Sequence, residues 1–346
     1  MSTPLPPNAF ERAVSRGGKF RNPSGRASQG FASALRWLAT RKRGAWPTSV
    51  TDVHVAPPAA RIDDGTIRAT IIGHATVLVQ VGGINFLTDP VMSTRIGPAS
   101  WLGPKRVRPP ALPLAEIPKI DVVLLSHDHY DHLDRPTLAA LAKRDDPLVL
   151  TGLKVGPKVP CRRIVELDWW QTHQLSGRTR VSYVPAEHFS GRGAFDRDAS
   201  LWGGFVVETP SGKVYFAGDT GTGAHFAAIR ERFGSMTLSL IPIGAYAPRW
   251  FMAPVHIDPA EALQASLDLE SQVSVAIHFA TFNLADEAYD APPQALRRAL
   301  AALEGEPAGS DFRIVPFGEA TIVQQRASAP VAALPHEVAE GEKATA

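Results

Sequence analysis

The feature that most constrains this chain is a cluster of polar residues that directly follows an apolar run. The run covers Ile120 to Leu125, and the chain then continues Ser126-His-Asp-His-Tyr-Asp-His-Leu-Asp134. Four potential metal ligands stand within six residues of this segment: His127, His129, Asp131 and His132. Alternate side chains of an extended segment face one way, so the first two can hold one cation, and the turn into a following helix can direct the other two to a neighbouring point. Without a cation, a buried cluster of this kind would leave several polar groups unpaired, each costing about 1 to 3 kcal/mol. The segment therefore predicts two metal ions at the end of a buried strand.

Further candidate ligands also stand at the ends of predicted strands: His188, Asp219 and His278. Hydrolytic sites with two ions hold them about 3.5 to 4 Å apart and need a bridging anionic ligand, additional imidazoles and an open position. Sites on open sheets gather at the carboxyl ends of strands, so we expect these residues beside the first cluster. The other histidines lack such a setting, and we interpret four of them as ordinary core or surface residues: His54, His173, His225 and His336.

Composition is that of a soluble globular protein. The chain has 346 residues, of which 44% are hydrophobic and 20% charged, which allows a large buried core and excludes a disordered chain. At about 150 residues per domain, this length permits one or two domains. The single cysteine, Cys161, excludes an internal disulfide. The first thirty residues contain no apolar signal region, and no apolar run reaches eighteen residues. We therefore expect neither a secretory signal nor a transmembrane helix, and a cytoplasmic or peripheral location.

Hydrophobic periodicity divides the chain into three parts. We expect a basic arm with one short helix over residues 1–50, one folded domain over 51–325 and a disordered tail over 326–346. Predicted helices cover 31–43, 134–143, 225–233, 259–268 and 292–303. Predicted strands cover 67–81, 83–87, 120–125, 180–185, 204–208, 213–217, 238–243, 273–278, 312–315 and 320–323, with a turn at Gly82-Gly83.

The charge of the chain is distributed unevenly. Residues 1–50 carry nine Lys or Arg against one acidic residue, Glu11, so the arm is +8 and the remaining chain, with a total of +2, is −6. The predicted helix of the arm also carries apolar residues: Phe31, Leu35, Trp37 and Leu38. This composition is typical of a helix that lies on an anionic membrane surface. The alternatives are a solvated leader, a contact with nucleic acid, or a helix that packs its apolar stripe on the body of the protein.

These residues resemble a known family. The pattern His127-x-His129-x-Asp131-His132, followed by His188, Asp219 and His278, is similar to the metallo-β-lactamase fold superfamily. A closer resemblance, to the N-acyl-phosphatidylethanolamine-hydrolysing phospholipase D family, rests on sequence blocks that run in order through residues 66–323. The blocks are Gly73-His-Ala-Thr-Val-Leu-Val, Leu87-Thr-Asp-Pro, Gly103-Pro-Lys-Arg, Ser126 to Asp134, Glu166-Leu-Asp-Trp-Trp, Phe216-Ala-Gly-Asp-Thr-Gly, Ile241-Pro-Ile-Gly-Ala-Tyr, Pro248-Arg-Trp-Phe-Met and His256-Ile-Asp-Pro-x-Glu-Ala, and Gly18-Lys-Phe-Arg-Asn-Pro extends the likeness into the arm.

The resemblance implies an α/β fold, an αββα sandwich of the metallo-β-lactamase type with a binuclear metal site at the rim of its sheets. It further implies that two zinc ions share seven ligands. One ion would be held by His127, His129 and His188, the other by Asp131, His132 and His278, with Asp219 bridging them. Asp89 would orient a ligand imidazole through its other ring nitrogen, and His74 either joins it or is a core histidine. Iron-dependent oxidoreductases of the superfamily typically carry a carboxylate where His129 stands, so this site favours zinc, although other divalent metals are possible.

The expected function is a zinc-dependent phosphodiesterase of phospholipase D type. Its products from N-acyl-phosphatidylethanolamine would be an N-acylethanolamine and phosphatidic acid. Catalysis is assigned to Asp131 and Asp219 among the ligands and to His256, which we rank above Arg249 as a phosphate contact. Aromatic residues that could form either an acyl groove or plain core are Trp169, Trp170, Trp202, Tyr246, Trp250 and Phe251.

Departures from the family pattern leave the substrate open. Glu187, Phe189 and Val255 differ from the residues expected in relatives, which puts the substrate groove in doubt. The alternative functions are a lactonase or a small-molecule phosphodiesterase on the same site, or a noncatalytic metal-bound interaction protein. Membrane contact through the arm is the expected interaction besides the phospholipid or other phosphodiester substrate. Nucleic acid is not expected as a partner, and a homodimer is left open.

Overall fold

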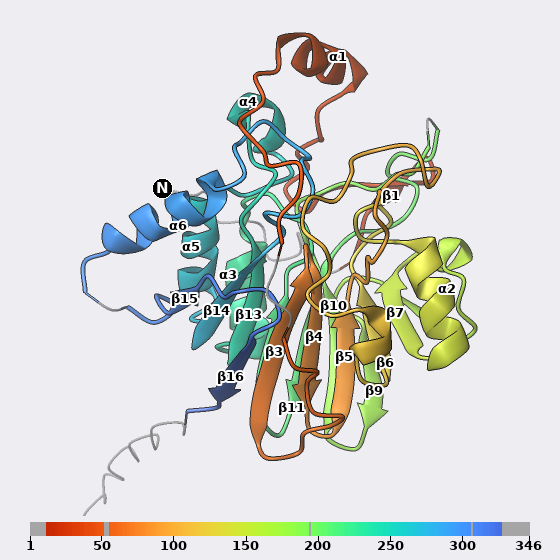
Figure 1. Ribbon diagram of the computed structural model, residues 1–346, viewed down its shortest axis with the longest axis vertical. Helices are drawn as coiled ribbons and strands as arrows, with labels where there is room; N and C mark the ends of the chain where they lie inside the picture. The colour runs from red at the N-terminus through yellow and green to blue at the C-terminus, as the bar shows by residue number, and fades with distance from the viewer. Residues whose placement is uncertain (1–11, 52–54, 194, 306, 327–346) are drawn as a thin grey trace, which may run out of the picture.

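Two seven-stranded sheets packed face to face, with helices on their outer faces, form the protein (Figure 1). The computed structural model describes residues 12–51, 55–193, 195–305 and 307–326. The order of the first sheet is β16 (Ala320–Gln324), β3 (Thr66–Gly73), β4 (Thr76–Val81), β5 (Ile84–Thr88), β6 (Val122–Leu125), β7 (Leu148–Gly152) and β8 (Ile164–Leu167). The order of the second sheet is β15 (Phe312–Arg313), β14 (Val273–Ile277), β13 (Leu238–Pro242), β12 (Gly212–Phe216), β11 (Gly204–Thr209), β10 (Thr179–Val184) and β9 (Thr172–Ser176).

Helices complete the αββα layers. Helix α2 (Arg135–Arg144) lies outside the first sheet, and α3 (His225–Phe233), α5 (Pro259–Asp268) and α6 (Ala291–Ala301) lie outside the second (Figure 1). Helices α1 (Phe31–Thr40) and α4 (Arg249–Met252) lie together beyond one end of the sandwich. Short 3₁₀ turns, η1 (Leu114–Glu116) and η2 (Gly156–Lys158), and a two-stranded ribbon, β1 (Ser15–Arg16) with β2 (Lys19–Phe20), complete the described elements. The expected αββα sandwich is confirmed.

Strands of the first sheet are buried on both faces, as β6 illustrates. Val122 and Leu124 face the core between the two sheets, whereas Val123 and Leu125 face the core under α2. An uninterrupted apolar run is the pattern expected for a parallel strand covered on both sides. Strands β5 to β8 pair in parallel, and so do β12 to β15. The carboxyl ends of each parallel set therefore meet at one edge of its sheet, and this is where the candidate ligands follow.

The ends of two helices and the position of one turn agree with the sequence prediction. Helix α5 begins at a capping box in which Asp258 accepts hydrogen bonds from the backbone of Ala260 and Glu261, and the Glu261 side chain returns to the backbone N–H of Asp258. The bounds predicted for α3 and α5 are confirmed, and the turn at Gly82-Gly83 joins β4 to β5.

Three expectations about elements were wrong. The single strand predicted over 67–81 is two strands, β3 and β4, which turn at His74 with φ at +56°. All residues from 69 to 81 are buried, so the periodicity gave no sign of the break. Helix α1 ends at Thr40, so the basic residues 41–43 lie beyond its last turn. Strands β7, β8 and β9 were not expected at all. The tail predicted over 326–346 lies outside the described residues from 327 onward.

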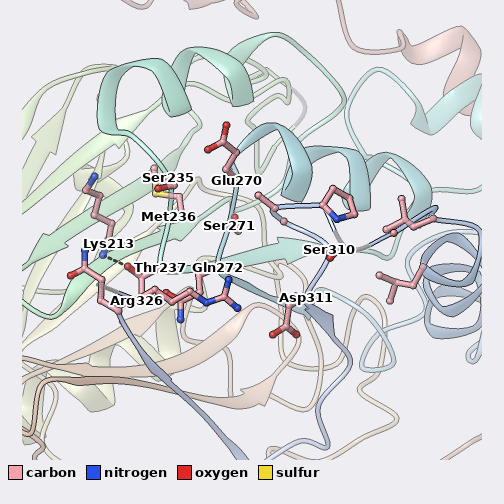
Figure 2. Close-up of a pocket in the computed structure, with 17 residues that line it drawn as sticks. Lys213, Ser235, Met236, Thr237, Glu270, Ser271, Gln272, Ser310, Asp311 and Arg326 are labelled. Carbon is pink, nitrogen blue, oxygen red and sulfur yellow. Dashed lines mark hydrogen bonds between the residues drawn. The ribbon is translucent and has the colours of Figure 1, made fainter. Parts of the chain in front are cut away.

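A cavity lies at the edge of the second sheet where β13 and β14 begin, away from the candidate ligands (Figure 2). It measures about 1060 Å³ and is lined by residues that precede β13 and β14, among them Met236 and Gln272. None of the candidate ligands reaches it. Its position at the amino ends of these strands separates it from the chemistry-bearing residues at their carboxyl ends.

Candidate metal centre

The segment 126–134, here called the ligand loop, begins where β6 ends. The chain turns immediately after His129, because its carbonyl oxygen accepts hydrogen bonds from the backbone N–H groups of His132 (3.1 Å) and Leu133 (2.8 Å). This turn brings four ligand candidates, which are separated by at most five positions, into one cluster.

Three imidazoles form one group of the centre. Nδ1 of His129 lies 2.8 Å from Nε2 of His127 and 3.2 Å from Nε2 of His188. Two nitrogens that bind a tetrahedral zinc ion at 2.0 to 2.1 Å are about 3.3 Å apart. His188 comes from the segment after β10 of the second sheet, so this group joins residues of both sheets.

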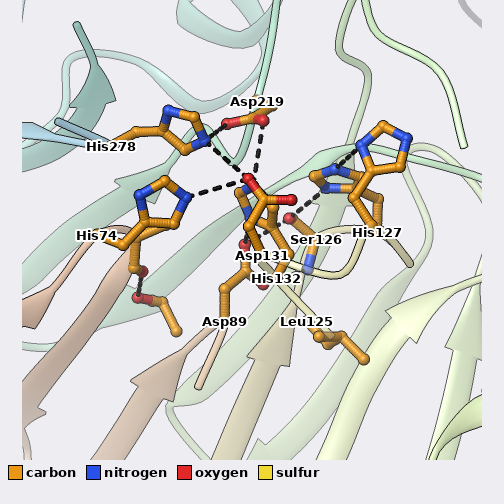
Figure 3. Close-up of polar contacts among 12 residues, drawn as sticks. His74, Asp89, Leu125, Ser126, His127, Asp131, His132, Asp219 and His278 are labelled. Carbon is orange, nitrogen blue, oxygen red and sulfur yellow. Dashed lines mark hydrogen bonds and ion pairs between the residues drawn. The ribbon is translucent and has the colours of Figure 1, made fainter. Parts of the chain in front are cut away.

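Asp131, His132 and His278 form the second group, with His74 beside them, and Asp219 lies next to His278 and Asp131 (Figure 3). Nε2 of His132 and of His278 each lie 3.1 Å from an oxygen of Asp219, and 3.4 Å and 3.5 Å from Oδ2 of Asp131. Asp219 Oδ2 is also 3.8 Å from Nε2 of His188, which belongs to the first group. The carboxylate of Asp219 therefore faces both sets of ligands.

Unpaired polar atoms show that this cluster fits a cation. Among the described residues, Oδ1 of Asp219 and Nε2 of His278 are both buried without a hydrogen-bond partner, although they lie 3.1 Å apart. Buried polar groups are nearly always hydrogen-bonded, and exceptions call for an ion, a water or a functional role. A donor set of imidazole nitrogens and carboxylate oxygens around these atoms is the chemistry of a transition-metal site.

The two carboxylates and the three histidines of the first group have the protonation states that metal binding requires. Burial alone would raise the pKa of Asp131 and Asp219, but neighbouring imidazoles, first of all His132, hold both pKa values well below the usual range. Burial lowers the pKa of His127, His129 and His188. The carboxylates are therefore ionised and these three imidazoles neutral at pH 7, the states in which they bind metal.

The second group attracts protons instead. Although burial opposes it, the carboxylates of Asp219 and Asp131 raise the pKa of His132 well above its usual value and that of His278 to about 9. The negative charge that raises these two pKa values also favours the binding of a metal cation.

Asp89 orients the ligand loop from the end of β5. Its Oδ2 lies 2.6 Å from Nδ1 of His132, and it also accepts hydrogen bonds from the hydroxyl and backbone N–H of Ser126 at 2.6 and 2.7 Å. The contact orients the His132 ring so that Nδ1 faces Asp89 and Nε2 faces Asp131 and Asp219.

His74 contacts the metal centre directly. Its Nε2 is 3.1 Å from Oδ2 of Asp131, and its ring centroid is 4.0 Å from that of His278. It reaches this position from the turn between β3 and β4, and its carbonyl oxygen accepts the backbone N–H of His278 at 2.9 Å. His74 thus contacts one candidate ligand through its ring and another through its backbone.

Asp128 resembles a ligand in the sequence but points away from the cluster. Its buried carboxylate accepts hydrogen bonds from the ammonium of Lys158, the hydroxyl of Ser200 (2.6 Å) and the backbone N–H of Gly191 (2.8 Å). Arg192 in turn donates to the carbonyl oxygens of Asp128 and Leu133. These contacts fix the ligand loop to residues 190–200 and were not predicted.

The basic arm contributes to the centre, which the sequence did not reveal. The side-chain oxygen of Asn22 accepts hydrogen bonds from the backbone N–H of His188 (2.8 Å) and from the indole of Trp202 (3.0 Å). Ser24 donates its backbone N–H and its hydroxyl to Glu187, at 2.8 and 2.6 Å. The signal that could have found these contacts is the block Gly18 to Pro23, which lies inside the family resemblance.

His256 lies at the partly exposed side of the cluster, here called the mouth of the centre, where the side chains of Asp131 and His256 are 14% and 12% exposed. Its Nδ1 is 4.0 Å from Oδ2 of Asp219, and burial lowers its pKa to about 4, so the ring is neutral at pH 7. Arg249 does not face the cluster. It donates to the carbonyl oxygen of His256 and to Glu261, both at 2.7 Å, so its role is structural.

The remaining aromatic and histidine candidates lie either in the core or nearer the surface. Trp169 and Trp202 are core residues, each 2% exposed, whereas Trp250 is exposed and Phe251 stacks on Trp37. Trp170 stacks on Phe233 and Tyr246 is half-buried. Of the histidines set aside, His225 is buried with Nε2 3.1 Å from the hydroxyl of Thr220, and His173 lies on β9. His54 and His336 lie outside the described residues.

An αββα sandwich with a buried cluster of imidazoles and carboxylates at the ends of its strands defines a metallohydrolase of the metallo-β-lactamase type. The family described as the β-lactamase superfamily domain matches residues 84–279, more than half of the chain, and the chain belongs to this superfamily. It is a metal-dependent hydrolase close to the N-acyl-phosphatidylethanolamine-hydrolysing phospholipases D, as the resemblance predicted. No helix in the described ranges is both long and apolar enough to cross a bilayer.

Individual relatives support this placement. An uncharacterized protein of Mycobacterium tuberculosis is 40% identical over 259 residues, which is 72% of this chain and 68% of that protein. N-acyl-phosphatidylethanolamine-hydrolyzing phospholipase D 1 of Caenorhabditis elegans is 36% identical over 264 residues, 72% of this chain and 74% of that protein. Among solved structures, Igni18, a metallo hydrolase from the archaeon Ignicoccus hospitalis, is 20% identical with a TM-score of 0.56 and covers 75% of this chain and all of its own, which shows the shared fold.

Proposed function

We propose that the protein is a zinc-dependent phosphodiesterase of phospholipase D type that hydrolyses N-acyl-phosphatidylethanolamine-like lipids to an N-acylethanolamine and phosphatidic acid. The observation that carries this proposal is the position of Asp219 between two ligand groups, in a chain 36% identical to a phospholipase D with that substrate in its name. A carboxylate shared by two groups is the arrangement that a binuclear hydrolytic site requires.

The proposed ligand sets follow the two groups. One zinc ion is assigned to His127, His129 and His188, and the other to Asp131, His132 and His278, with Asp219 bridging them. Imidazole nitrogen and carboxylate oxygen are common zinc ligands in catalytic sites, which supports zinc over softer or harder metals. Bound ions at such a site lower the pKa of water toward neutrality and neutralise charge on the phosphoryl oxygens.

The side chains of this protein set up the rest of the reaction. Asp131 and Asp219 stay ionised at neutral pH because the imidazoles around them, His132 above all, outweigh the effect of burial on their pKa. Asp89 keeps Nε2 of His132 directed at the centre. His256, neutral and next to Asp219, can donate one hydrogen bond from its ring to a phosphoryl oxygen of the substrate. No covalent enzyme intermediate is required.

An assay of the purified zinc-loaded protein against three substrates tests the proposal. The substrates are N-acyl-phosphatidylethanolamine in mixed micelles, bis-para-nitrophenyl phosphate and an acyl-homoserine lactone. We expect release of N-acylethanolamine, slower cleavage of the soluble phosphodiester, no lactone opening, and loss of all activity with a chelator. Lactone opening without phosphodiester cleavage would establish the lactonase alternative instead, and absence of any turnover by the metal-loaded protein would favour a noncatalytic role.

A further inference from the structure

Helix α1 is fixed to the body of the protein by one of its faces. Trp37 stacks on Phe251 with ring centroids 4.9 Å apart, and its indole nitrogen donates to Asp286 at 2.8 Å. Arg41, just past the end of the helix, donates to the same carboxylate at 2.9 Å. The helix is therefore docked, and its position relative to α4 and the metal centre is defined.

The opposite face of α1 carries a row of exposed apolar side chains. Phe31 is 78% exposed, Leu35 50% and Leu38 56%. Their spacing of four and three residues places them on one stripe of the helix, about a quarter turn or more away from Trp37. Scattered exposed apolar residues are normal on a protein surface, but a stripe that fills one side of a docked helix marks an interaction surface.

Helix α1, which carries this stripe, lies beside α4 beyond one end of the sandwich (Figure 1). His256, four residues after the end of α4, reaches to 4.0 Å from Asp219 of the metal centre. The guanidinium of Arg36 lies 4.9 Å above the ring of Trp250, which is itself 44% exposed on α4. Loops that adjoin the ligand loop expose further large apolar residues: Trp101, Leu102 and Phe195. The mouth of the centre is therefore bordered by apolar side chains that have no covering layer in the described part of the chain.

The charge around α1 identifies the partner. Residues 12–43 contain nine Lys or Arg and no acidic residue. A cavity of about 500 Å³ beneath the helix, lined in part by Phe31, is bordered by four basic side chains and one acidic one: Lys19, Arg21, Arg26, Arg197 and Asp198. Apolar side chains flanked by cationic ones match a membrane surface of anionic lipid, in which chains insert below the headgroups and each cation near the surface adds about 1 kcal/mol.

A protein partner fits these observations less well. Specific protein interfaces bury about 800 Å² on each side, whereas α1 has only ten residues and spans about 15 Å. A bilayer needs no shape complementarity and accepts a short stripe with neighbouring aromatic residues.

We propose that α1 inserts Phe31, Leu35 and Leu38 into an anionic phospholipid bilayer and thereby holds the mouth of the metal centre at the lipid surface. This inference deepens the proposed function and rests on it for its purpose, because only a lipid substrate requires the centre to approach the headgroups. The contacts of Trp37 and Arg41 with Asp286 transmit the position of the inserted helix to the body of the enzyme.

Vesicle sedimentation with a matched pair of variants tests this surface. The first variant replaces the stripe, Phe31→Ser, Leu35→Ser and Leu38→Ser, and the control, Ile322→Ser, removes an equally exposed apolar residue on β16, far from α1. The vesicles are phosphatidylcholine with or without phosphatidylglycerol. We expect wild type and control to bind the anionic vesicles, and the stripe variant to bind at least about tenfold more weakly. All three should cleave bis-para-nitrophenyl phosphate at the same rate and melt at the same temperature.

Several outcomes would overturn the inference. Undiminished vesicle binding by the stripe variant would exclude insertion through α1. A wild type that ignores vesicles but forms a dimer which the stripe variant breaks would assign the surface to a second copy of the chain. A protein that binds anionic vesicles through the stripe yet cleaves no lipid phosphodiester would contradict the proposed function and leave this surface in place, so the two failures are distinguishable.

Discussion

The side chain of Asn22 holds the backbone of His188 across 166 positions of sequence, through a hydrogen bond of 2.8 Å from the N–H of His188 to Oδ1 of Asn22. The same oxygen accepts the indole N–H of Trp202, and both partners are buried. A residue of the basic arm therefore positions a candidate metal ligand, and the arm cannot be regarded as a leader independent of the centre.

Replacing Asn22 with Ala should weaken both stability and metal binding. The buried backbone N–H of His188 would lose its acceptor, which costs about 1 to 3 kcal/mol, whereas the indole N–H of Trp202 would keep the carbonyl oxygen of Ala186 at 3.0 Å. We expect a lower melting temperature together with a lower metal content after dialysis against a weak chelator. The control is Gln174→Ala, an exposed side chain on β9 with hydrogen bonds of its own. Equal metal retention by the Asn22→Ala variant would show that His188 needs no support from the arm.

Replacing Asp219 with Ala should remove more metal than replacing a ligand that belongs to one group only, such as His129. Asp219 faces both groups and offsets the repulsion between two cations. Elemental analysis of the wild type is expected to give about two ions per chain, and the Asp219→Ala variant fewer than the His129→Ala variant. An active wild type without transition metal would rule out the binuclear mechanism.

His256→Ala should lower turnover and leave the metal content unchanged. The ring stands 4.0 Å from Asp219 but outside the two ligand groups, and its loss removes one hydrogen bond to the substrate. We expect a fall in kcat of about 10- to 100-fold, the size of a hydrogen bond to a charged group. Since its pKa is about 4, the difference from wild type should be constant between pH 6 and pH 8. Metal loss in this variant would instead make His256 a ligand.

His225 should make the protein less stable in acid. Burial lowers the pKa of this core imidazole to about 3, whereas in the unfolded chain it titrates near 6.5. Unfolding therefore takes up a proton below pH 6.5, so stability is complete above that pH and declines as the pH falls toward 3. A His225→Leu variant should show a shallower decline of melting temperature over this range than wild type. Parallel pH profiles for the two proteins would refute the assignment.

The sequence predicted best the ligand candidates that lie close together in the chain. His127, His129, Asp131 and His132 come from one turn, and their spacing alone brings them together. His188, Asp219 and His278 could be added because each follows a strand end, although only the fold shows that strands of two different sheets end at one point.

What the sequence missed depends on contacts between distant segments. The partners of Asn22 and Ser24 at residues 187–188 lie more than 160 positions away, so no local pattern indicates this pairing, and only the family block Gly18 to Pro23 pointed to the arm. Asp128 has the residue type of a ligand, and only the positions of Lys158 and Ser200 show that it faces elsewhere. The break between β3 and β4 was hidden because both strands are buried.

Two of the sequence interpretations of the arm, a membrane contact and a helix packed on the body, apply to different residues. Asn22 and Ser24 contact the body, and Trp37 packs α1 onto it, as the structural interpretation requires. Phe31 and Leu35 face solvent, as a membrane contact requires. Deleting the whole arm would therefore damage the centre as well as the surface, which is why substitutions on the exposed face are the more informative experiment.

The ligand groups are divided between the halves of the chain, since the ligand loop follows β6 of the first sheet whereas Asp219 and His278 follow β12 and β14 of the second. Neither half contains a complete set of ligands. An ion bound here would connect the two halves to each other. The metal content of a sample would therefore measure the fraction of chains in which both sheets are packed together. During unfolding its release should coincide with separation of the sheets, and a fragment ending anywhere between residues 134 and 188 should form no such centre, however well its own sheet folds.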